Sequence, residues 1–260
     1  MSKNMELCHA LIKACVNVSS NLLAKNEYYT HEDLQHAMKQ ACNFIYGNVN
    51  NVKLLKIGNH KLHKNTMIFD LPSIMTCKGA CKSCYALKSE RIYANTRRMR
   101  MFHLILTDAC RYNKDIYKLV INQLYNEILN FSNKNMGMVF VRFHSSGDIY
   151  CNEYLQLILN LVNKCLKLKS VKFYTYTKQL DNKTIDDINN KYYNFNIVKS
   201  ILEDKHGNKY INYGTIEYLK KLKNNIDDLF ICSYGTNKPA TCMGNCHACT
   251  CHAHVAFIQH

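Results

Sequence analysis

The chain has 260 residues, 47% of them hydrophobic, which excludes a disordered protein and suits one domain with a sizeable core, or one domain and an appendage. No apolar run is long enough to span a membrane, so we expect no membrane partner. The formal net charge of +15 leaves two explanations open: binding to nucleic acid or another polyanion, or the codon bias of an AT-rich genome, since the lysines are spread along the chain.

Residues 1–50 are predicted to form an N-terminal helical segment. Apolar residues recur at three- and four-residue steps over 5–24 and over about 31–46, which indicates two amphipathic helices. Thr30, with Asp33 three residues later, is the expected N-cap of the second helix. Three cysteines on or near the apolar faces are interpreted as small core residues: Cys8, Cys15 and Cys42.

Residues 51–260 are expected to form an α/β domain in which strands and helices alternate. A two-stranded unit over 51–71 comes first, and Pro72 stops its second strand. Further strands are expected at 137–144, 171–177, 195–200 and 229–233, the last of the chain, and helices at 86–109, with a basic side at Arg97, Arg98 and Arg100, and at 113–131, 151–166, 184–191 and 215–223. This order predicts a mostly parallel sheet, open or curled into a partial barrel.

A nine-residue phrase with the pattern T-C-x-G-x-C-x-x-C occurs twice, at 76–84 and at 241–249. One curl of such a loop brings three sulfurs to a soft metal centre, and thiolate-rich sites select zinc or iron–sulfur clusters. A chain of this length needs no disulfides and shows no secretory signal, so its 14 cysteines favour a reducing compartment, the cytoplasm. The predicted metal ligands are Cys77, Cys81, Cys84, Cys242, Cys246, Cys249 and Cys251.

We predict that these thiols bind a [4Fe-4S] cluster, either one cluster shared by the two phrases or two clusters. The main alternative is zinc, because the second and third cysteines of each phrase form a C-x2-C pair, and two such pairs can make a closed four-thiolate site. The zinc interpretation leaves Cys77 and Cys242 without a role, whereas a three-cysteine loop can reach several corners of a cubane.

The chemical groups are expected to converge at one edge of the sheet. Both cysteine phrases, the loop at 145–148 and the turn at Thr177 follow strand ends, and the carboxyl ends of parallel strands share a rim. For Asp148, a loop-capping role is the alternative to ligand contact. The ligand-binding candidates in this loop are His144, Ser146, Gly147 and Asp148.

The first phrase resembles the radical S-adenosylmethionine enzymes, in which C-x3-C-x2-C follows the first strand of a partial α/β barrel and leaves one iron open for the cofactor. The resemblance implies an acidic loop after the next strand, a place that Gly147-Asp148 fills. The chain departs from that family at Ser83, where an aromatic residue is usual, and at Ser145-Ser146, since the loop reads S-S-G-D. The second phrase could also supply the fourth ligand and close the open iron.

A combination of pieces resembles the viral "gene product eighty-eight" family, regarded as iron–sulfur cluster binders: L-P-x3-T-C-x-G-x-C-x2-C-Y-A at 71–86, V-R-x-H-x-S-G-D-x-Y at 141–150, F-Y-x-Y-T-K at 173–178, and the late cysteines. The resemblance implies an intracellular viral protein, in the host cytoplasm, a viral factory or a virion, that binds [4Fe-4S]. Two function classes stay open: a non-catalytic or regulatory protein that senses redox state or docks a partner, favoured by the surplus of thiols, and a radical S-adenosylmethionine enzyme.

Overall fold

The structure is a computed structural model that describes residues 2–23, 27–47, 52–58, 62, 64–77, 84–199, 213–214, 229–231, 249 and 254–258. Its elements, in chain order, are α1 (Lys3–Val18), the π-helical turn η1 (Ser19–Leu23), α2 (His31–Tyr46), β1 (Lys56–Ile57), β2 (Thr66–Phe69), α3 (Ser73–Thr76), α4 (Tyr85–Ile92), α5 (Ala94–Ala109), α6 (Lys114–Lys134), β3 (Val139–Phe143), α7 (Asn152–Lys164), β4 (Val171–Thr177), α8 (Asn182–Lys191), β5 (Phe195–Lys199), β6 (Tyr213–Gly214), β7 (Leu229–Ile231) and β8 (His254–Ile258).

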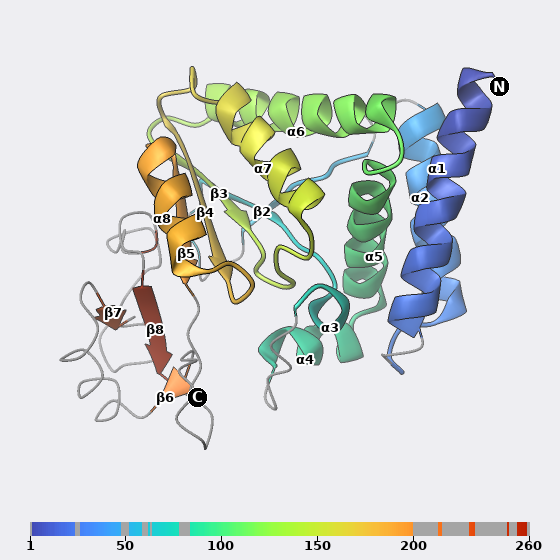
Figure 1. Cartoon of the computed structure of the whole chain (residues 1–260), viewed down its shortest axis with the longest axis horizontal. Helices are drawn as coiled ribbons and strands as arrows, with labels where there is room; N and C mark the ends of the chain where they lie inside the picture. The colour runs from blue at the N-terminus through green and yellow to red at the C-terminus, as the bar shows by residue number, and fades with distance from the viewer. Residues whose placement is uncertain are drawn as a thin grey trace.

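The strands form one sheet in the order β1-β2-β3-β4-β5-β8-β6, with β7 also paired to β8 (Figure 1). Within the described part of the chain, the β1–β2 pair alone is antiparallel, and β2 to β5 are parallel neighbours in chain order. The α/β fold with a mostly parallel sheet is therefore confirmed. The sheet is open, since the described strands do not close into a barrel.

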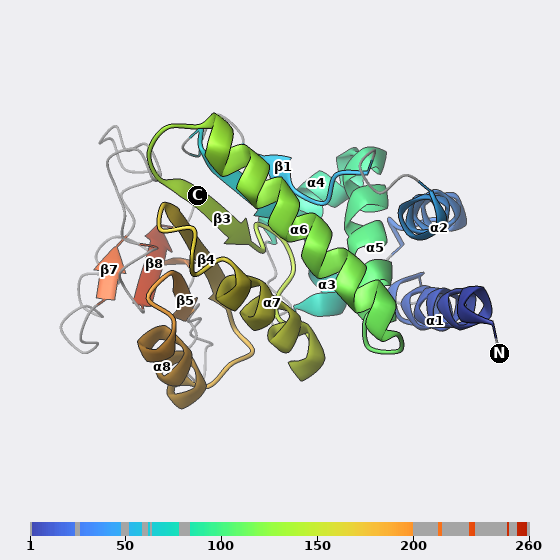
Figure 2. The same cartoon turned by 90° about the horizontal axis from the view of Figure 1, so that it is seen from above.

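One face of this sheet carries the main hydrophobic core. Consecutive parallel strands joined by crossovers of one hand place their connecting helices on the same side, and α6, α7 and α8 all contribute buried residues to this core (Figure 2). Alternate side chains of the strands point into it, as the two-residue period of a strand requires. They are Met67, Phe69, Val139, Val141, Phe143, Val171, Phe173, Phe195 and Ile197.

The two N-terminal helices pack on α5 and share its apolar cluster (Figure 2). The predicted capping box of α2 is confirmed: the Asp33 N–H donates to Thr30 Oγ1 at 3.2 Å, and the Thr30 N–H donates to the Asp33 carboxylate. Cys42 packs against the core as predicted, whereas the prediction for Cys8 is wrong, because its side of α1 is exposed. Among the described helices, none has the length and apolar character that crossing a membrane requires.

The single helix predicted over 86–109 is wrong, since Tyr93 adopts an extended backbone between α4 and α5. The break is stabilised by Arg97, whose Nη1 donates to the Glu90 carbonyl oxygen at 2.8 Å near the end of α4. The predicted basic side of this helix is also changed by folding. Arg97 and Arg98 pair with Asp33, and Arg100 pairs with Glu90.

Two strand predictions need correction. The first strand is short because the N–H groups of Leu54 and Leu55 both donate to the Glu127 carboxylate, at 2.8 Å each, instead of to a strand partner. The strand expected at 229–233 appears as β7, but it is not the last strand, since β8 follows and pairs with it in parallel. The helix expected at 215–223 lies outside the described residues.

Candidate functional site

The loops after β2, β3 and β4 meet at Asp148. Its Oδ1 accepts hydrogen bonds from the Ile149 N–H at 2.7 Å and the Thr177 hydroxyl at 2.6 Å, and its Oδ2 accepts from the Lys178 N–H at 2.8 Å. The Asp148 N–H donates to Thr76 Oγ1 at 3.2 Å, which brings in the residue before the first cysteine. Three strand ends therefore share one rim.

Asp148 is almost fully buried, at 2% exposure. Burial raises the pKa of this carboxyl group to about 6, even though the Thr177 hydroxyl and two backbone N–H groups favour its charged form. The carboxylate caps its own loop at the Ile149 N–H and also joins that loop to the end of β4, at Thr177 and Lys178. Contact between Asp148 and a ligand stays a prediction.

Gly147 lets the 145–148 loop approach the segment after β2. Its φ of +86° lies in the left-handed region, and an added Cβ would lie 2.6 Å from Thr76 Oγ1 and 2.7 Å from Leu71 Cβ. Next to it, the Ser146 hydroxyl donates to the Leu71 carbonyl oxygen at 2.9 Å. The S-G-D residues at 146–148 thus allow this loop to pack closely against the start of the first cysteine phrase.

His144 begins the same loop with a φ of +63°, unusual for a residue other than glycine. The Thr175 hydroxyl donates to the Phe143 carbonyl oxygen, so His144 Nδ1 donates to Thr175 Oγ1 at 2.8 Å, and the Tyr154 hydroxyl donates to His144 Nε2 at 2.9 Å. Burial lowers the pKa of His144 to about 3, which keeps the ring neutral. Both ring nitrogens are therefore bonded inside the core.

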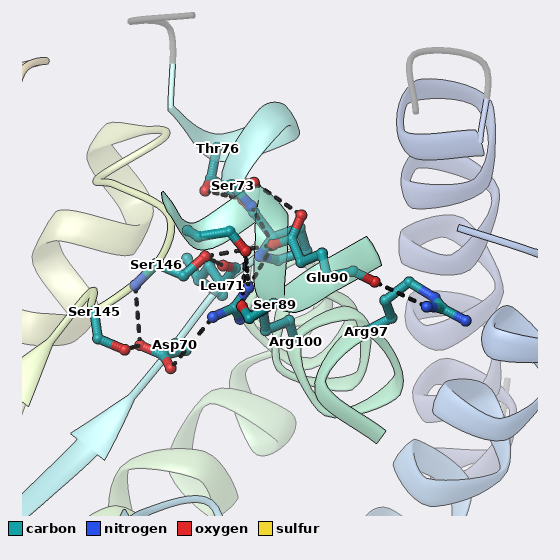
Figure 3. Close-up of polar contacts among 12 residues, drawn as sticks. Asp70, Leu71, Ser73, Thr76, Ser89, Glu90, Arg97, Arg100, Ser145 and Ser146 are labelled. Carbon is teal, nitrogen blue, oxygen red and sulfur yellow. Dashed lines mark hydrogen bonds and ion pairs between the residues drawn. The ribbon is translucent and has the colours of Figure 1, made fainter. Parts of the chain in front are cut away.

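A buried charge network, not predicted from the sequence, anchors the β2 end of the rim (Figure 3). The Asp70 carboxylate forms an ion pair with the Lys56 ammonium and lies 3.9 Å from Arg100 Nη2. It also accepts a hydrogen bond from the Ser145 hydroxyl at 2.5 Å. Burial alone would raise the pKa of Asp70, but the two cations and the serine hold it at about 2. The only sequence signal for this network was the carboxylate of Asp70, placed at the end of a predicted strand.

Glu90 extends this network to the segment that precedes Cys77 (Figure 3). Its Oε1 lies 2.8 Å from Arg100 Nη1 and accepts from the Ser73 N–H at 2.9 Å, and its Oε2 accepts from the Ser73 hydroxyl at 2.8 Å. Ser73 is the first residue of α3, and Cys77 follows the end of this short helix. The start of the first phrase is therefore held by a fully buried carboxylate.

Three of the seven predicted metal ligands are among the described residues. Cys77 follows α3 and is partly buried, Cys84 precedes the first turn of α4, and Cys249 is buried against the sheet. The described ranges contain no group of three or more His, Cys, Asp or Glu side chains close enough to hold a metal ion. The remaining four predicted ligands lie outside the described residues: Cys81, Cys242, Cys246 and Cys251.

Cys249 and Thr76, the residue before Cys77, are both in contact with the carboxyl end of β4. The Tyr176 hydroxyl donates to Cys249 Sγ, and the Gln179 side chain donates to the carbonyl oxygen of Thr76 at 3.4 Å. Tyr176 and Gln179 stand three residues apart, on either side of the strand end. Each cysteine phrase is therefore in contact with the carboxyl end of β4, one through the strand and the other through the turn that follows it.

The Gene product 88 family model matches residues 48–258. The chain belongs to the Gene product 88 family. The matched range covers the sheet, the rim and both cysteine phrases of this Gene product 88 protein, and it leaves α1 and α2 outside. No curated protein and no solved structure shows significant similarity to the chain.

Proposed function

We propose that this Gene product 88 protein binds a [4Fe-4S] cluster in the cytoplasm and acts as a non-catalytic or regulatory protein. The observation that carries the proposal is that both cysteine phrases contact the carboxyl end of β4, through Gln179 and Tyr176. Thiolate sulfur is the donor that such clusters require. The residues that would hold the cluster are Cys77, Cys81, Cys84, Cys242, Cys246, Cys249 and Cys251.

The cluster, when bound, would supply one-electron redox chemistry, and the chain's own residues would fix and shield it. Glu90 holds the segment before Cys77 through Ser73, and Asp70 joins the end of β2 to Ser145 of the loop after β3. Asp148 favours the non-catalytic function, because its two carboxylate oxygens accept hydrogen bonds from Ile149 on its own loop and from Thr177 and Lys178 at the end of β4. A carboxylate that binds the amino group of a cofactor needs an oxygen directed at that cofactor.

Metal analysis tests this proposal directly. Protein purified without oxygen should be brown, absorb broadly at about 400 nm and contain roughly four iron and four sulfide per cluster. Colourless protein with stoichiometric zinc would support the four-thiolate zinc site instead. Zinc remains the second candidate metal because each phrase contains a C-x2-C pair.

Single serine substitutions test whether the two phrases share one cluster. Cys77→Ser and Cys246→Ser should each abolish the same spectroscopic signal and lower stability, since metal binding contributes to folding. Cys8→Ser is the matched control, because Cys8 lies on the exposed side of α1, outside both phrases. A full-strength signal in Cys246→Ser would mean that the first phrase binds its own cluster.

The alternative function is a radical S-adenosylmethionine enzyme. Parallel strands in chain order, with helices on one face and loops gathered at the carboxyl ends, favour it. Addition of S-adenosylmethionine to the reduced protein decides between the two, by electron paramagnetic resonance and by release of 5′-deoxyadenosine. An unchanged spectrum, with no effect of Asp148→Ala on cofactor binding, supports the non-catalytic function.

A further inference from the structure

The face of the sheet opposite the main core is aromatic and polar. Phe140 and Arg142 of β3, Tyr174 and Tyr176 of β4, and Asn196 of β5 alternate with core residues along their strands. Arg142 lies opposite Tyr174 in the β3–β4 register, and Tyr174 lies opposite Asn196 in the β4–β5 register. These side chains therefore form one contiguous surface across three strands.

Cys249 is seated on this surface. It is 5% exposed and packs against Phe140 and Tyr174. Asn196 Nδ2 donates to the Cys249 carbonyl oxygen at 2.9 Å, while the Tyr176 hydroxyl donates to Cys249 Sγ. The backbone and the sulfur of Cys249 are thus held separately, by side chains of two neighbouring strands.

Tyr176 is itself held in a fixed place. The Arg142 guanidinium lies over its ring, 5.3 Å from the centroid, and the Tyr174 ring meets it edge-on at 6.1 Å and 85°. A cation over the ring draws electron density from the phenol, and this polarisation makes the hydroxyl a stronger hydrogen-bond donor. Arg142 also places a positive charge over the ring whose hydroxyl contacts the Cys249 sulfur.

We propose that Tyr176 is a positioning residue that, with Arg142 behind it, fixes the Cys249 sulfur and raises the reduction potential of the iron–sulfur centre that Cys249 ligates. The inference rests on the proposed function and extends it to residues outside the cysteine phrases. A hydrogen bond to a ligand sulfur withdraws negative charge from the cluster. The reduced cluster carries one more electron than the oxidised one, so this contact stabilises it preferentially.

Tyr176→Phe tests the contact because it removes the hydroxyl and keeps the ring. Stepwise reduction of the purified protein with dithionite, followed by absorbance or electron paramagnetic resonance, should give the wild-type iron content but a more negative reduction potential. Arg142→Gln should shift the potential in the same direction. The control is Tyr193→Phe, which makes the same change at an exposed tyrosine whose hydroxyl donates to the Leu166 carbonyl oxygen. An iron-loaded Tyr176→Phe protein with the wild-type potential overturns the inference.

Failure of the proposed function gives a different result. If the purified protein contains no iron, the proposed function is wrong. The fixed position of Cys249 on the sheet is then tested separately, by alkylation with iodoacetamide and peptide mass mapping. The inference expects Cys249 to react much more slowly than the exposed Cys8, and Asn196→Ala to speed the reaction at Cys249 but not at Cys8. Equal rates at the two thiols in the wild-type protein overturn it.

Discussion

Gly147 occupies a position where a side chain is excluded by both backbone and packing. Gly147→Ala combines a left-handed φ of +86° with a Cβ only 2.6 Å from Thr76 Oγ1. We expect it to lower the free energy of unfolding by more than about 2 kcal/mol, because strain and overpacking add. Urea unfolding followed by circular dichroism measures this loss.

Gly137→Ala is the matched control for the Gly147 variant. Gly137 has nearly the same φ, +89°, but no atom within 4 Å of an added Cβ. It should lose only the strain energy, about 1 kcal/mol. If both variants lose the same free energy, the close approach of the 145–148 loop to Thr76 and Leu71 does not contribute to stability.

The buried charge network joins Arg100 of α5 to Glu90 of α4 and to Asp70, which directly follows β2. Its guanidinium lies 2.8 Å from Glu90 and 3.9 Å from Asp70, and all three side chains are at most 6% exposed. Arg100→Met should cost about 3–5 kcal/mol, since it leaves Glu90 buried without its cation. Thermal or urea unfolding measures the loss, and the segment before Cys77 should become more sensitive to proteolysis.

An exposed ion pair provides the control for Arg100. Lys3 and Asp115 lie 3.2 Å apart with side chains 73% and 41% exposed. Lys3→Met should change stability by less than about 1 kcal/mol, as is usual for surface pairs. A loss at Arg100 as small as that at Lys3 would show that the network is dispensable.

The sequence predicted those elements whose signal is local. The capping box of α2, the apolar faces of α6 and α7, and the short apolar strands β3 to β5 each follow from residues near one another in the chain. The short β1 does not, since it depends on Glu127, which is 73 residues from Leu54 and 72 from Leu55. The break at Tyr93 is accompanied by a contact between Arg97 and Glu90, seven residues apart, which the apolar periodicity does not reveal.

The same division holds for the candidate site. The strand-end position of Asp148 predicted the shared rim, because parallel strands place their carboxyl ends together. The network of Asp70, Glu90 and Arg100 could not be predicted from spacing, since its members meet only after α4 and α5 separate. The place of Cys249 on the sheet is also a tertiary contact, made by side chains of β4 and β5.

The whole fold should lose stability in acid because it buries two neutral histidines. Burial lowers the pKa of His144 to about 3 and that of His103 to about 4, while an unfolded histidine titrates near pH 6.5. Below about pH 6.5 the unfolded chain therefore binds more protons at these rings than the folded protein does. The free energy of unfolding then decreases as the pH is lowered. Asp148, with its raised pKa of about 6, opposes this between about pH 6 and 4, because there the folded protein binds the extra proton.

His103→Gln should reduce the pH dependence measurably. Near pH 5 the slope of the unfolding free energy against pH should fall by about 1.4 kcal/mol per pH unit, because there the unfolded ring holds nearly one proton more than the folded ring. Urea titrations at several pH values give the slope. His9→Gln makes the same substitution at an exposed position of α1 and serves as the control. A His103→Gln slope equal to that of the wild-type protein would contradict neutral burial of His103.

The position of Cys249 on the sheet also affects the order in which parts of the chain fold during synthesis. Strands β2 to β5 pair in the order in which a ribosome releases them, so each new strand finds its neighbour already present. The five side chains of the surface that contacts Cys249 all lie more than 50 residues before it in the sequence: Phe140, Arg142, Tyr174, Tyr176 and Asn196. The surface of β3 to β5 that contacts Cys249 can thus form before the late cysteines leave the ribosome. Packing of Cys249 against this surface is then one of the last steps of folding.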